Sequence, residues 1–462
     1  MSEHCDALVL GGGMAGLPLA LRASRHESVV LIERELLGGT CLNRVCIPTK
    51  TMIASATVAQ SVRRASMFGV TASEPVVDLA EVVARKNRIV AGIRAGSYRA
   101  VEGRRGLELV EGDGHFVADH TIEVNGRRIQ ADRIFLNTGT RDSPGTISGL
   151  ADTPHLNSRT ILDLEELPPH LIVVGGGFIG CEFAQMFRRF GSEVTLIQRA
   201  ERLLPGEDPE ISAAVEEGFA ADGVTVVTST SCTHVGGRTG SVTVGCTGDG
   251  PGEVTGTHLL MAVGRVPNSD DIGLEHLGVE TDSSGFVRVD DRLRAVGTTD
   301  VWALGDLRGG PMFTHTARDD ADIIYRNVYR GGDRSTDGRI VPHAVFVDPE
   351  VASVGLTEEE ARASGYEVVV GRQPFAGVAR AMALGRTTGL VKLVVNGADD
   401  RILGCHVAGP HAGELIHEVT LAMYAGVRHH DIGAMIHVHP TLSEALNSAS
   451  GGVHRPAAPP TP

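Results

Sequence analysis

Short apolar runs, glycine-rich turns and amphipathic segments alternate along most of this 462-residue chain. Residues 6–34 begin with an apolar run, pass through glycines and a helical period, and end in a second apolar run, which predicts strand, turn, helix and strand. The same pattern recurs at residues 171–198. This repeat predicts an α/β fold with two Rossmann-like dinucleotide-binding domains derived from one ancestral unit.

The rest of the chain also has patterns that predict strands and helices. Strand and helix signals alternate to about residue 150, with a hairpin-rich patch at 107–136, and β-rich segments follow the second unit to about residue 263. Strands predicted at 390–395 and 402–407 precede a helix at 413–424. A chain of this length is too long for one hydrophobic core, so two or three domains are expected.

Composition narrows the class of protein. With 42% hydrophobic and 21% charged residues the chain is typical of a soluble globular protein, and its formal net charge of −15 disfavours nucleic acid or an anionic membrane as a partner. No apolar stretch is long enough to span a bilayer. The seven cysteines are scattered and odd in number, which argues against a secreted disulfide framework and predicts a reducing, cytoplasmic location.

The first glycine turn has the features of a dinucleotide-binding fingerprint. Gly11 and Gly13 permit a tight turn and the close approach of a pyrophosphate to the helix N-terminus, and Gly16 lets the helix pack closely on the strand. Glu33 ends the following strand, where its carboxylate can accept hydrogen bonds from a ribose diol. Glycine-rich turns are common, but here strand, turn, helix, strand and acid occur in the required order.

The second turn carries equivalent glycines at Gly175, Gly177 and Gly180. Its second strand ends differently, because Gln198 and Arg199 stand where the first unit has Glu33. A carboxylate there favours an unphosphorylated ribose, whereas an amide with arginines suits a 2′-phosphate, so NADPH is expected to be preferred over NADH. The alternative is that Arg199 and Arg202 are solvated loop charges.

Two closely spaced cysteines, Cys41 and Cys46, follow the first unit. Five steps along an ideal helix separate two Cα atoms by roughly 8–9 Å, whereas a disulfide needs less than about 7 Å. Either the first helical turn is distorted or Cys41 lies outside the helix, and Pro48 supports distortion because it cannot donate a hydrogen bond to the Arg44 carbonyl. Unrelated buried cysteines or half of a metal site are alternatives. No second cysteine or histidine pair lies nearby to complete tetrahedral ligation, so a redox-active dithiol without metal is expected.

With these features together, the chain resembles the flavin-dependent pyridine nucleotide–disulfide oxidoreductases, the family of dihydrolipoamide dehydrogenase, glutathione reductase and mercuric reductase. The resemblance extends from residue 6 to about residue 450. Besides the two fingerprints and residues 38–50, it rests on the runs at 264–268, 303–306, 309–316 and 439–444. The run 309–316 and the Gln198-Arg199 ending look most like the mercuric-reductase-like branch.

The resemblance implies a role for each motif. The first fingerprint and Glu33 would bind the ADP half of FAD, Asp306 the ribityl chain, and the second fingerprint the nicotinamide nucleotide. Cys46 would be the thiol next to the flavin, and Cys41 the interchange thiol that faces the substrate. Further cofactor contacts are implied for Thr40, Lys50, Thr138, Gly139 and Gly264.

Four residues would complete the implied site. Lys50 would pair with Glu182 beside the flavin, and His439, held by Glu444, would serve as acid–base for Cys41 of the other subunit. Lys50 has support of its own, because a cation one helical turn after the flavin-side thiol lowers the pKa of that thiol. Only three of the 42 lysine and arginine residues are lysines, so a lysine at this place is informative.

These assignments have structural alternatives. Lys50 could be a surface lysine, and Glu182 a first-turn carboxylate favoured by the helix dipole. Thr441 and Glu444 have the spacing of a capping box, which is compatible with the implied role of Glu444. Three histidines that precede His439 in the sequence are interpreted as loop residues rather than metal ligands: His429, His430 and His437.

The domain boundaries are expected between the motifs. An FAD-binding domain is expected in two parts, an NAD(P)H-binding domain between them, and an α+β interface domain that joins two subunits into a homodimer. The expected ranges are 1–150 and 269–340 for the FAD-binding domain, 151–268 for the NAD(P)H-binding domain, 341–455 for the interface domain and 456–462 for a disordered, proline-rich tail.

Three departures from the family pattern matter. Val45 stands where the family usually has glycine before the flavin-side cysteine, and a β-branched residue resists positive φ. Arg44 replaces a usual apolar residue and adds a charge near the dithiol. The C-terminal tail lacks the cysteine pair by which mercuric reductases deliver metal, which argues against mercury reduction.

The sequence therefore predicts a homodimeric FAD enzyme in which electrons pass from NADPH through the flavin and the Cys41–Cys46 disulfide to a small-molecule acceptor of the disulfide type. Three alternatives remain: a mercuric or cupric ion reductase that uses the same dithiol, a dihydrolipoamide dehydrogenase subunit of a multienzyme complex, and a non-catalytic flavoprotein.

Overall fold

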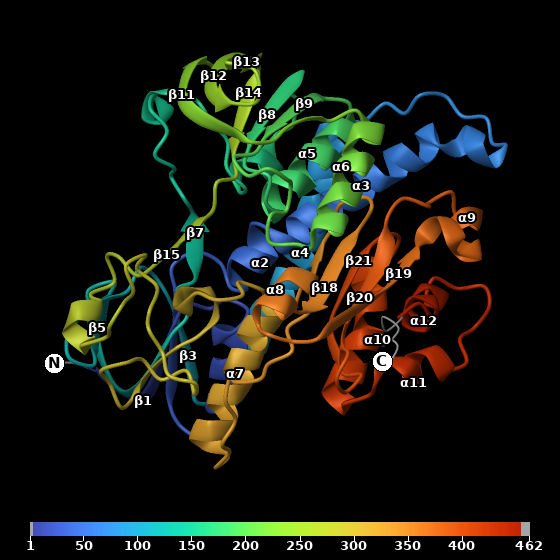
Figure 1. The fold of residues 1–462 in the computed structure, drawn as a ribbon. Coiled ribbons are helices and arrows are strands. Elements are labelled where there is room, and N and C mark those ends of the chain that lie inside the picture. The colour runs from blue at the N-terminus through green and yellow to red at the C-terminus, as the bar shows by residue number, and fades with distance from the viewer. Residues whose placement is uncertain (1–2, 454–462) are drawn as a thin grey trace.

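The computed structural model describes residues 3–453 and places the first repeat in a seven-stranded sheet of order β3-β2-β1-β6-β5-β4, with β16 beside β6 (Figure 1). Its strands are β1 (Glu3–Leu10), β2 (Val29–Glu33), β3 (Leu107–Glu111), β4 (His115–Ala118), β5 (Thr121–Val124), β6 (Arg127–Leu136) and β16 (Val301–Ala303). Strand β1 pairs in parallel with both β2 and β6. The first glycine turn therefore leaves the sheet from a central strand.

The predicted hairpin-rich patch at 107–136 is partly wrong. Strands β4, β5 and β6 do form an antiparallel meander, but β3 runs parallel to β2. A parallel neighbour requires a long crossover, and the 23-residue helix α4 (Leu79–Val101), which ends shortly before β3, provides it.

The apolar residues of β1 alternate between two hydrophobic clusters. Ala7 and Val9 pack with helices α1 (Gly16–Ala23) and α7 (Thr314–Tyr329), whereas Leu8 and Leu10 pack with the β4–β5 meander. A strand covered on both faces has to be apolar throughout, which explains the unbroken run in the sequence.

The second repeat forms a four-stranded parallel sheet of order β10-β9-β8-β14. Its elements are β8 (His170–Val174), α5 (Phe178–Phe190), β9 (Glu193–Ile197), α6 (Pro209–Asp222), β10 (Thr225–Val227) and β14 (His258–Met261). An antiparallel sheet covers it, made of β11 (Thr230–Arg238), β12 (Ser241–Gly248) and β13 (Glu253–Gly256). Two short antiparallel strands connect this part with the first, β7 (Thr140–Asp142) and β15 (Arg265–Pro267).

Helices α2 (Gly39–Asn43) and α3 (Cys46–Arg63) begin the segment after β2. Met52 and Ala56 of α3 share one hydrophobic cluster with α5, with β8 and β9, and with the C-terminal sheet. Figure 1 shows α3 passing between the second unit and that sheet. The N-terminal end of α3, which carries Cys46, is thereby fixed where the parts of the molecule meet.

The C-terminal part is a five-stranded antiparallel sheet of order β17-β18-β21-β20-β19 with helices against it. Its strands are β17 (His343–Val345), β18 (Val351–Gly355), β19 (Val368–Pro374), β20 (Leu390–Asn396) and β21 (Ile402–Ala408). Its helices are α8 (Glu358–Ala363), α9 (Ala379–Ala383), α10 (Ala412–Ala425), α11 (His429–Ala434) and α12 (Glu444–Gly451). The predicted strands at 390–395 and 402–407 and the predicted helix at 413–424 agree with β20, β21 and α10 to within one residue at each end.

The interpretation of the neighbouring histidines as loop residues is wrong for two of them. His429 and His430 are the first residues of α11, where the Asp431 carboxylate accepts the Arg428 N–H and caps the helix. His437 contacts the Glu418 carboxylate at 3.0 Å. Within residues 3–453 no group of three or more histidine, cysteine, aspartate or glutamate side chains is arranged to hold a metal ion.

Short 3₁₀ turns complete the fold: Ala65–Phe68, Leu150–Asp152, Thr160–Asp163, Leu274–Leu277, Gly305–Arg308 and Phe375–Gly377. In the described part of the chain no helix combines the length and apolar character needed to cross a membrane. The tail predicted to be disordered, 456–462, lies outside the described residues.

Candidate active site

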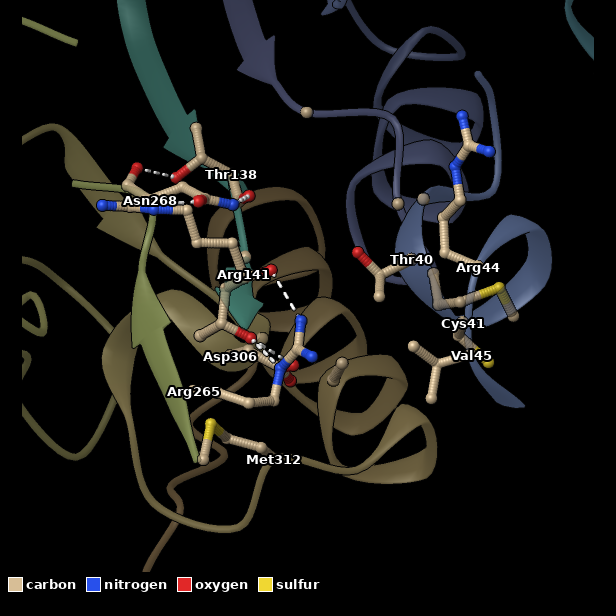
Figure 2. A pocket seen from close by; sticks show the side chains of 18 of the residues that line it. Thr40, Cys41, Arg44, Val45, Thr138, Arg141, Arg265, Asn268, Asp306 and Met312 are labelled. Atoms are coloured by element: carbon tan, nitrogen blue, oxygen red, sulfur yellow. Dashed lines mark hydrogen bonds between the residues drawn. The ribbon is translucent and has the colours of Figure 1, made fainter. Parts of the chain in front are cut away.

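A cavity of about 840 Å³ is lined by the first glycine turn, the start of α5, the dithiol segment and the loop before α7 (Figure 2). Its volume is within the range of cofactor sites. Thirteen of the predicted site residues line it: Gly11, Gly13, Glu33, Thr40, Cys41, Cys46, Lys50, Thr138, Gly139, Gly177, Glu182, Gly264 and Asp306. Five others are not among its lining residues: Gly16 begins α1, Gly175 lies in the second glycine turn, Gly180 lies in α5, and Gln198 and Arg199 follow β9. His439 and Glu444 lie elsewhere on the chain.

The first glycine turn is built so that larger residues do not fit. Gly11 has φ +104°, and a Cβ atom on Gly16 would lie 2.0 Å from the Gly11 carbonyl oxygen. The Glu33 carboxylate accepts the N–H of Gly12 at 2.8 Å and that of Glu35 at 2.8 Å. Burial raises the pKa of Glu33 despite these two hydrogen bonds. Each carboxylate oxygen keeps a lone pair with which it can accept a hydroxyl.

Asp306 gives a direct test of whether the cavity fits a ribityl chain. The carboxylate is half-buried and accepts a 3.3 Å hydrogen bond from the Thr140 hydroxyl. Burial raises the pKa of Asp306, and the nearby Arg265 guanidinium opposes that rise. A half-buried carboxylate with spare acceptor capacity on a large cavity suits the hydroxyls of a polyol, so this residue fits FAD.

Two reciprocal hydrogen bonds between Thr138 and Asn268 hold one edge of the cavity. The Thr138 hydroxyl donates to the Asn268 carbonyl at 2.7 Å, and the Asn268 amide donates to the Thr138 carbonyl at 2.8 Å (Figure 2). Gly139 has φ +69° and accepts the Asn268 N–H. These contacts connect the end of β6 to the segment that follows β15.

The second glycine turn has the same backbone form. Gly175 has φ +110°, and a Cβ atom on Gly180 would lie 1.8 Å from the Gly175 carbonyl oxygen. The Gln198 side-chain oxygen accepts the N–H groups of Gly176 at 3.2 Å and of Arg199 at 3.1 Å. Arg199 is exposed at the end of β9.

Arg202, the other arginine considered for a 2′-phosphate, is differently placed. Its guanidinium forms an ion pair with Glu201 at 3.0 Å and lies 3.9 Å from Glu359. The charge that remains available at this end of the nucleotide turn is therefore that of Arg199.

The two cysteines lie on different helices, one of the two alternatives left open by the sequence. Cys41 belongs to α2, and Cys46 is the first residue of α3. The chain breaks at Arg44 and Val45, whose N–H groups both donate to the Thr40 carbonyl at 2.9 Å. This break brings the two thiols close enough for each to shift the pKa of the other.

The surroundings of the two thiols give them different pKa values. The hydrogen bond from Cys41 lowers the pKa of Cys46 to about 7, with help from the Lys50 charge and the Thr314 hydroxyl and against the effect of burial. The same hydrogen bond, together with burial, raises the pKa of Cys41. The Cys46 sulfur lies 4.0 Å from the Thr314 hydroxyl at the start of α7. At neutral pH the shared negative charge therefore resides on Cys46.

Lys50 and Glu182 form a close ion pair. The Lys50 ammonium donates to both carboxylate oxygens of Glu182 at 2.8 Å, and the Phe346 N–H also donates to this carboxylate at 3.1 Å. Glu182 is 5% exposed. The pair lines the cavity together with Cys46, which contradicts the alternative of a surface lysine.

Val45 has a negative φ, and the Arg44 side chain has an acidic partner. Val45 has φ −132°, so the backbone conformation that a β-branched residue resists does not occur here. The Arg44 guanidinium bonds to Glu35 at 3.2 Å, and Figure 2 shows its side chain directed away from Cys41. The expected extra charge beside the dithiol is thus directed elsewhere.

His439 and Glu444 meet as the resemblance implied, at 2.9 Å. The His439 side chain is 73% exposed, and the His439 hydrogen bond lowers the pKa of Glu444. Only half of the predicted capping box forms, because Glu444 accepts the Thr441 N–H while the Thr441 hydroxyl donates to the Val438 carbonyl. Apolar residues with large exposed fractions occur in the segment before His439 and in α10: Met435, Ile436 and Val438, and Leu421 and Tyr424.

The comparisons with known proteins agree with this geometry. Residues 5–321 match the pyridine nucleotide-disulphide oxidoreductase family, and residues 341–450 match the dimerisation domain of the same family. The chain belongs to the pyridine nucleotide-disulphide oxidoreductases, which are FAD-dependent flavoproteins with a redox-active disulfide. The dimerisation domain supports a homodimer.

Individual relatives span almost the whole chain. A mercuric reductase of Lysinibacillus sphaericus is 34% identical over 97% of this chain and 82% of its own length. A dihydrolipoyl dehydrogenase of Thermus scotoductus is 36% identical over 98% of both chains. The Cu(II) complex of the HOCl-induced flavoprotein disulfide reductase RclA from Escherichia coli superposes with a TM-score of 0.87 at 32% identity, covering 96% of this chain and 98% of that one.

Three residues of the site could not be assigned a role from the sequence. Thr314 belongs to the run 309–316, but nothing in its spacing connects it to Cys46, 268 positions earlier. Phe178 follows Gly177 directly and lines the cavity, so its place after the glycine turn is a usable signal. His343 stands in a segment without a motif, and only the fold brings it beside Phe178.

Proposed function

We propose that this protein passes electrons from NADPH through FAD to the Cys41–Cys46 pair and then to a small-molecule disulfide. The observation that carries the proposal is the acidic Cys46 thiol, with a pKa of about 7 that Cys41 lowers, one helical turn from Lys50. All three residues line the cavity to which both glycine turns contribute.

FAD, when bound, supplies a hydride acceptor that returns electrons to the dithiol. The first glycine turn, Glu33 and Asp306 would hold it, and the Lys50–Glu182 pair would supply a compensated positive charge to the cavity. Cys46 holds the negative charge on the flavin side, and Cys41 is the thiol that attacks the acceptor disulfide. The nicotinamide nucleotide binds at Gly175–Gly180, with Arg199 available to a 2′-phosphate.

His439 serves Cys41 of the opposite subunit as acid–base in this proposal. It is exposed in the single chain, oriented by Glu444, and preceded by exposed apolar residues that a second copy would cover. The site is then completed only in the homodimer. The proposed domain division is 1–150 with 269–340, 151–268 and 341–455, and the scattered cysteines support a reducing cytoplasm as the enzyme's location.

Subunit complementation tests the shared site. A Cys41→Ala variant and a His439→Ala variant, each inactive alone, should regain activity when mixed, because each heterodimer contains one intact site. Subunit exchange can be followed with differently tagged chains. If the chains exchange and no activity returns, His439 acts within its own subunit or is not the base.

A second function, reduction of a soft metal ion, is favoured by one observation. Two of the similar proteins are a mercuric reductase and a reductase solved as a Cu(II) complex. A dithiol with one acidic member is also a ligand pair for such ions. NADPH and NADH oxidation against low-molecular-weight disulfides, lipoamide, quinones, Hg(II), Cu(II) and oxygen separates the possibilities. Turnover with a metal ion and none with any disulfide would overturn the disulfide proposal.

A further inference from the structure

A second pair of cysteines lies across two neighbouring strands of the second unit. Cys232 of β11 and Cys246 of β12 are register partners in an antiparallel ladder. Both side chains pack on the same hydrophobic cluster, so they extend from the same face of this sheet. The two thiols are close enough for each to shift the pKa of the other. The fold therefore forms a second dithiol, in addition to Cys41 and Cys46.

The backbone geometry of the second dithiol suits a disulfide. The Cys246 N–H donates to the Gly252 carbonyl of the neighbouring segment at 2.8 Å, so it is not directed at Cys232. The two cysteines thus form a non-hydrogen-bonded pair, in which opposite Cα atoms lie about 4.5 Å apart. Disulfides span Cα separations of about 4.4–6.8 Å. The register shift between Cys232 and His234 also gives β11 local freedom to adjust, so the backbone places the pair within reach of a disulfide.

The second dithiol differs from Cys41 and Cys46 in its access and in its pKa values. Neither Cys232 nor Cys246 lines the cavity, and β11 and β12 lie at the end of the second unit that faces away from the C-terminal sheet (Figure 1). Cys232 is half-buried, whereas Cys246 is 7% exposed. Burial raises the pKa of both thiols, that of Cys232 to about 12, so few thiolates exist at neutral pH. Cys232 is therefore the thiol that solvent reaches first, and the pair reacts slowly.

We propose that Cys232 and Cys246 are a redox modification site, which a small-molecule disulfide closes to a second disulfide bond. In the first step the Cys232 sulfur attacks the small disulfide, its proton passes to the sulfur that leaves, and a mixed disulfide remains on Cys232. The Cys246 sulfur then attacks the Cys232 sulfur and expels the second small thiol, which takes the Cys246 proton. Two electrons pass from the protein to the small disulfide, and two small thiols are released for each bond formed.

The position of the pair gives this bond a structural effect. The Thr230 N–H, two residues before Cys232, donates to the Gln198 carbonyl at 3.0 Å. The Ser229 N–H donates to the Ala200 carbonyl at 2.8 Å. These two hydrogen bonds hold the segment that follows β9, at the end of the nucleotide turn. A crosslink between β11 and β12 reduces local opening of these strands, so the closed form protects both amides.

Peptide mass mapping tests the bond directly. The FAD-loaded protein is incubated overnight with oxidised glutathione, its remaining thiols are alkylated in denaturant, and it is digested with trypsin. Arg238 lies between the two cysteines, so cleavage places Cys232 in peptide 203–238 and Cys246 in peptide 239–265. These two peptides should be recovered as one disulfide-linked species that dithiothreitol separates. Cys232→Ser and Cys246→Ser should each abolish this species.

The same digest contains two internal controls. Arg44 separates Cys41 from Cys46, so their link is detected in the same way, and it should form faster because the pKa of Cys46 is about 7. Cys405 is buried in β21 opposite a valine and a leucine, and it should be recovered alkylated. After the glutathione is removed, NADPH should open the Cys41–Cys46 link and leave the second one closed, because the second dithiol does not line the cavity.

Hydrogen exchange gives a second readout that does not depend on catalysis. Peptides that contain the Ser229 and Thr230 amides should exchange at least about threefold more slowly in the closed form than in the open form. In Cys232→Ser the treatment with glutathione should make no such difference.

Three outcomes overturn the proposal. Recovery of Cys232 and Cys246 as alkylated thiols, in a sample whose Cys41–Cys46 link has formed, would mean that the pair does not react as a dithiol. Opening of the second link by NADPH would mean that it is not separate from the catalytic pair. Equal exchange of the two amides in both forms would mean that the bond does not hold the segment after β9. None of these outcomes depends on which acceptor the catalytic dithiol reduces.

Discussion

The two glycine turns of this molecule share their backbone geometry, and the strand that follows each of them ends in a different side chain. A Cβ atom on Gly12 would lie 2.7 Å from Leu37, and one on Gly176 would lie 2.7 Å from Leu203. Gly11 and Gly175 have φ values of +104° and +110°. Both turns therefore exclude side chains at the same steps, and both leave room for a pyrophosphate at the start of the helix.

The difference lies at the end of the second strand. Glu33 accepts the Gly12 N–H in the first unit, and Gln198 accepts the Gly176 N–H in the second. An acceptor oxygen is thus what the turn needs for its own structure, and the amide supplies it as well as the carboxylate. The fold does not need a negative charge at this position. The presence or absence of that charge can therefore select the ribose.

The units differ again in the segment after that strand. After β2 the chain enters α2 and α3 with the two cysteines, whereas after β9 it runs through Arg199 and Arg202 to α6. The largest effect is therefore expected from Cys41 and Cys46, because the second unit has no counterpart that could replace them. Cys41→Ser and Cys46→Ser should each lower disulfide reduction by at least about a thousandfold, as loss of a catalytic nucleophile does.

The spectra of the two cysteine variants distinguish their roles. Cys41→Ser should show a long-wavelength charge-transfer band without added reductant, because Cys46 is then a free thiolate next to the flavin. Cys46→Ser should show no band. If Cys46→Ser keeps the band and the turnover, the roles assigned to the pair are wrong.

The shared backbone constraint can be broken in one unit at a time. Gly16→Ala and Gly180→Ala place a Cβ atom within 2.0 and 1.8 Å of a carbonyl oxygen. Gly16→Ala should lower the flavin content of the purified protein, whereas Gly180→Ala should keep the flavin and raise the KM for NADPH by about tenfold or more.

A glycine without this constraint is the control for both variants. Gly96 lies in α4, where an added Cβ atom would have its nearest neighbour, an Arg99 side-chain nitrogen, at 3.8 Å. Gly96→Ala should keep flavin content and KM and should not lower the melting temperature. Flavin loss in Gly180→Ala would mean that the two turns are not independent.

The acid-to-amide difference predicts nucleotide choice. Arg199→Glu should shift the ratio of kcat/KM values from NADPH toward NADH by roughly tenfold, since a charge-assisted phosphate contact is worth about 1.5–3 kcal/mol. Glu33→Gln is the matched control, because it makes the first unit resemble the second and should weaken FAD binding without changing the nucleotide ratio. An unchanged ratio in Arg199→Glu would assign this arginine to solvent.

The acidity of Cys46 predicts a pH dependence. Its pKa lies below the usual thiol value, at about 7, so the thiolate is present above pH 7 and is lost as the pH falls through it. The charge-transfer band of the two-electron-reduced enzyme should therefore grow between about pH 6 and pH 8. Lys50→Met should move the midpoint upward by about one pH unit, because an opposite charge no longer favours the thiolate. A midpoint that stays at about 7 would assign the acidity to Cys41 and Thr314 alone.

The smallest effect is expected from Val45→Gly. Because Val45 has a negative φ, no backbone strain is relieved by glycine, and the band and the turnover should change by no more than about twofold. A severalfold gain in both would show that the valine side chain displaces the flavin-side thiol.

Most of the local structure could be predicted because it depends on neighbouring residues. The spacing of apolar residues predicts the strands beside the glycine turns and the helix at 413–424. Residues that tolerate positive φ predict the turns themselves. The parallel pairing of β3 could not be predicted, because the same short apolar run serves a hairpin or a crossover, and a long helix elsewhere decides between them.

The site was predictable where one short segment carries it and not where the fold assembles it. Cys41, Cys46 and Lys50 lie within ten residues, and the resemblance paired Lys50 with Glu182. The contacts of Thr314 with Cys46 and of His343 with Phe178 join segments 268 and 165 positions apart, and the side chains involved have no motif of their own. Arg44 illustrates the converse, since its charge was visible in the sequence but its partner Glu35 was not.

Lysine is rare in this chain, and the structure assigns a partner to every one. Lys86 pairs with Asp163, Lys392 pairs with Asp208, and each of these lysines is 3% exposed. Lys50 lines the cavity and pairs with Glu182. Amine-directed reagents such as succinimidyl esters consequently have almost no side-chain target on the outer surface. Acylation of Lys50, located by peptide mass mapping, would then report whether the cavity is open, and its protection on adding FAD would give a chemical footprint of the cofactor.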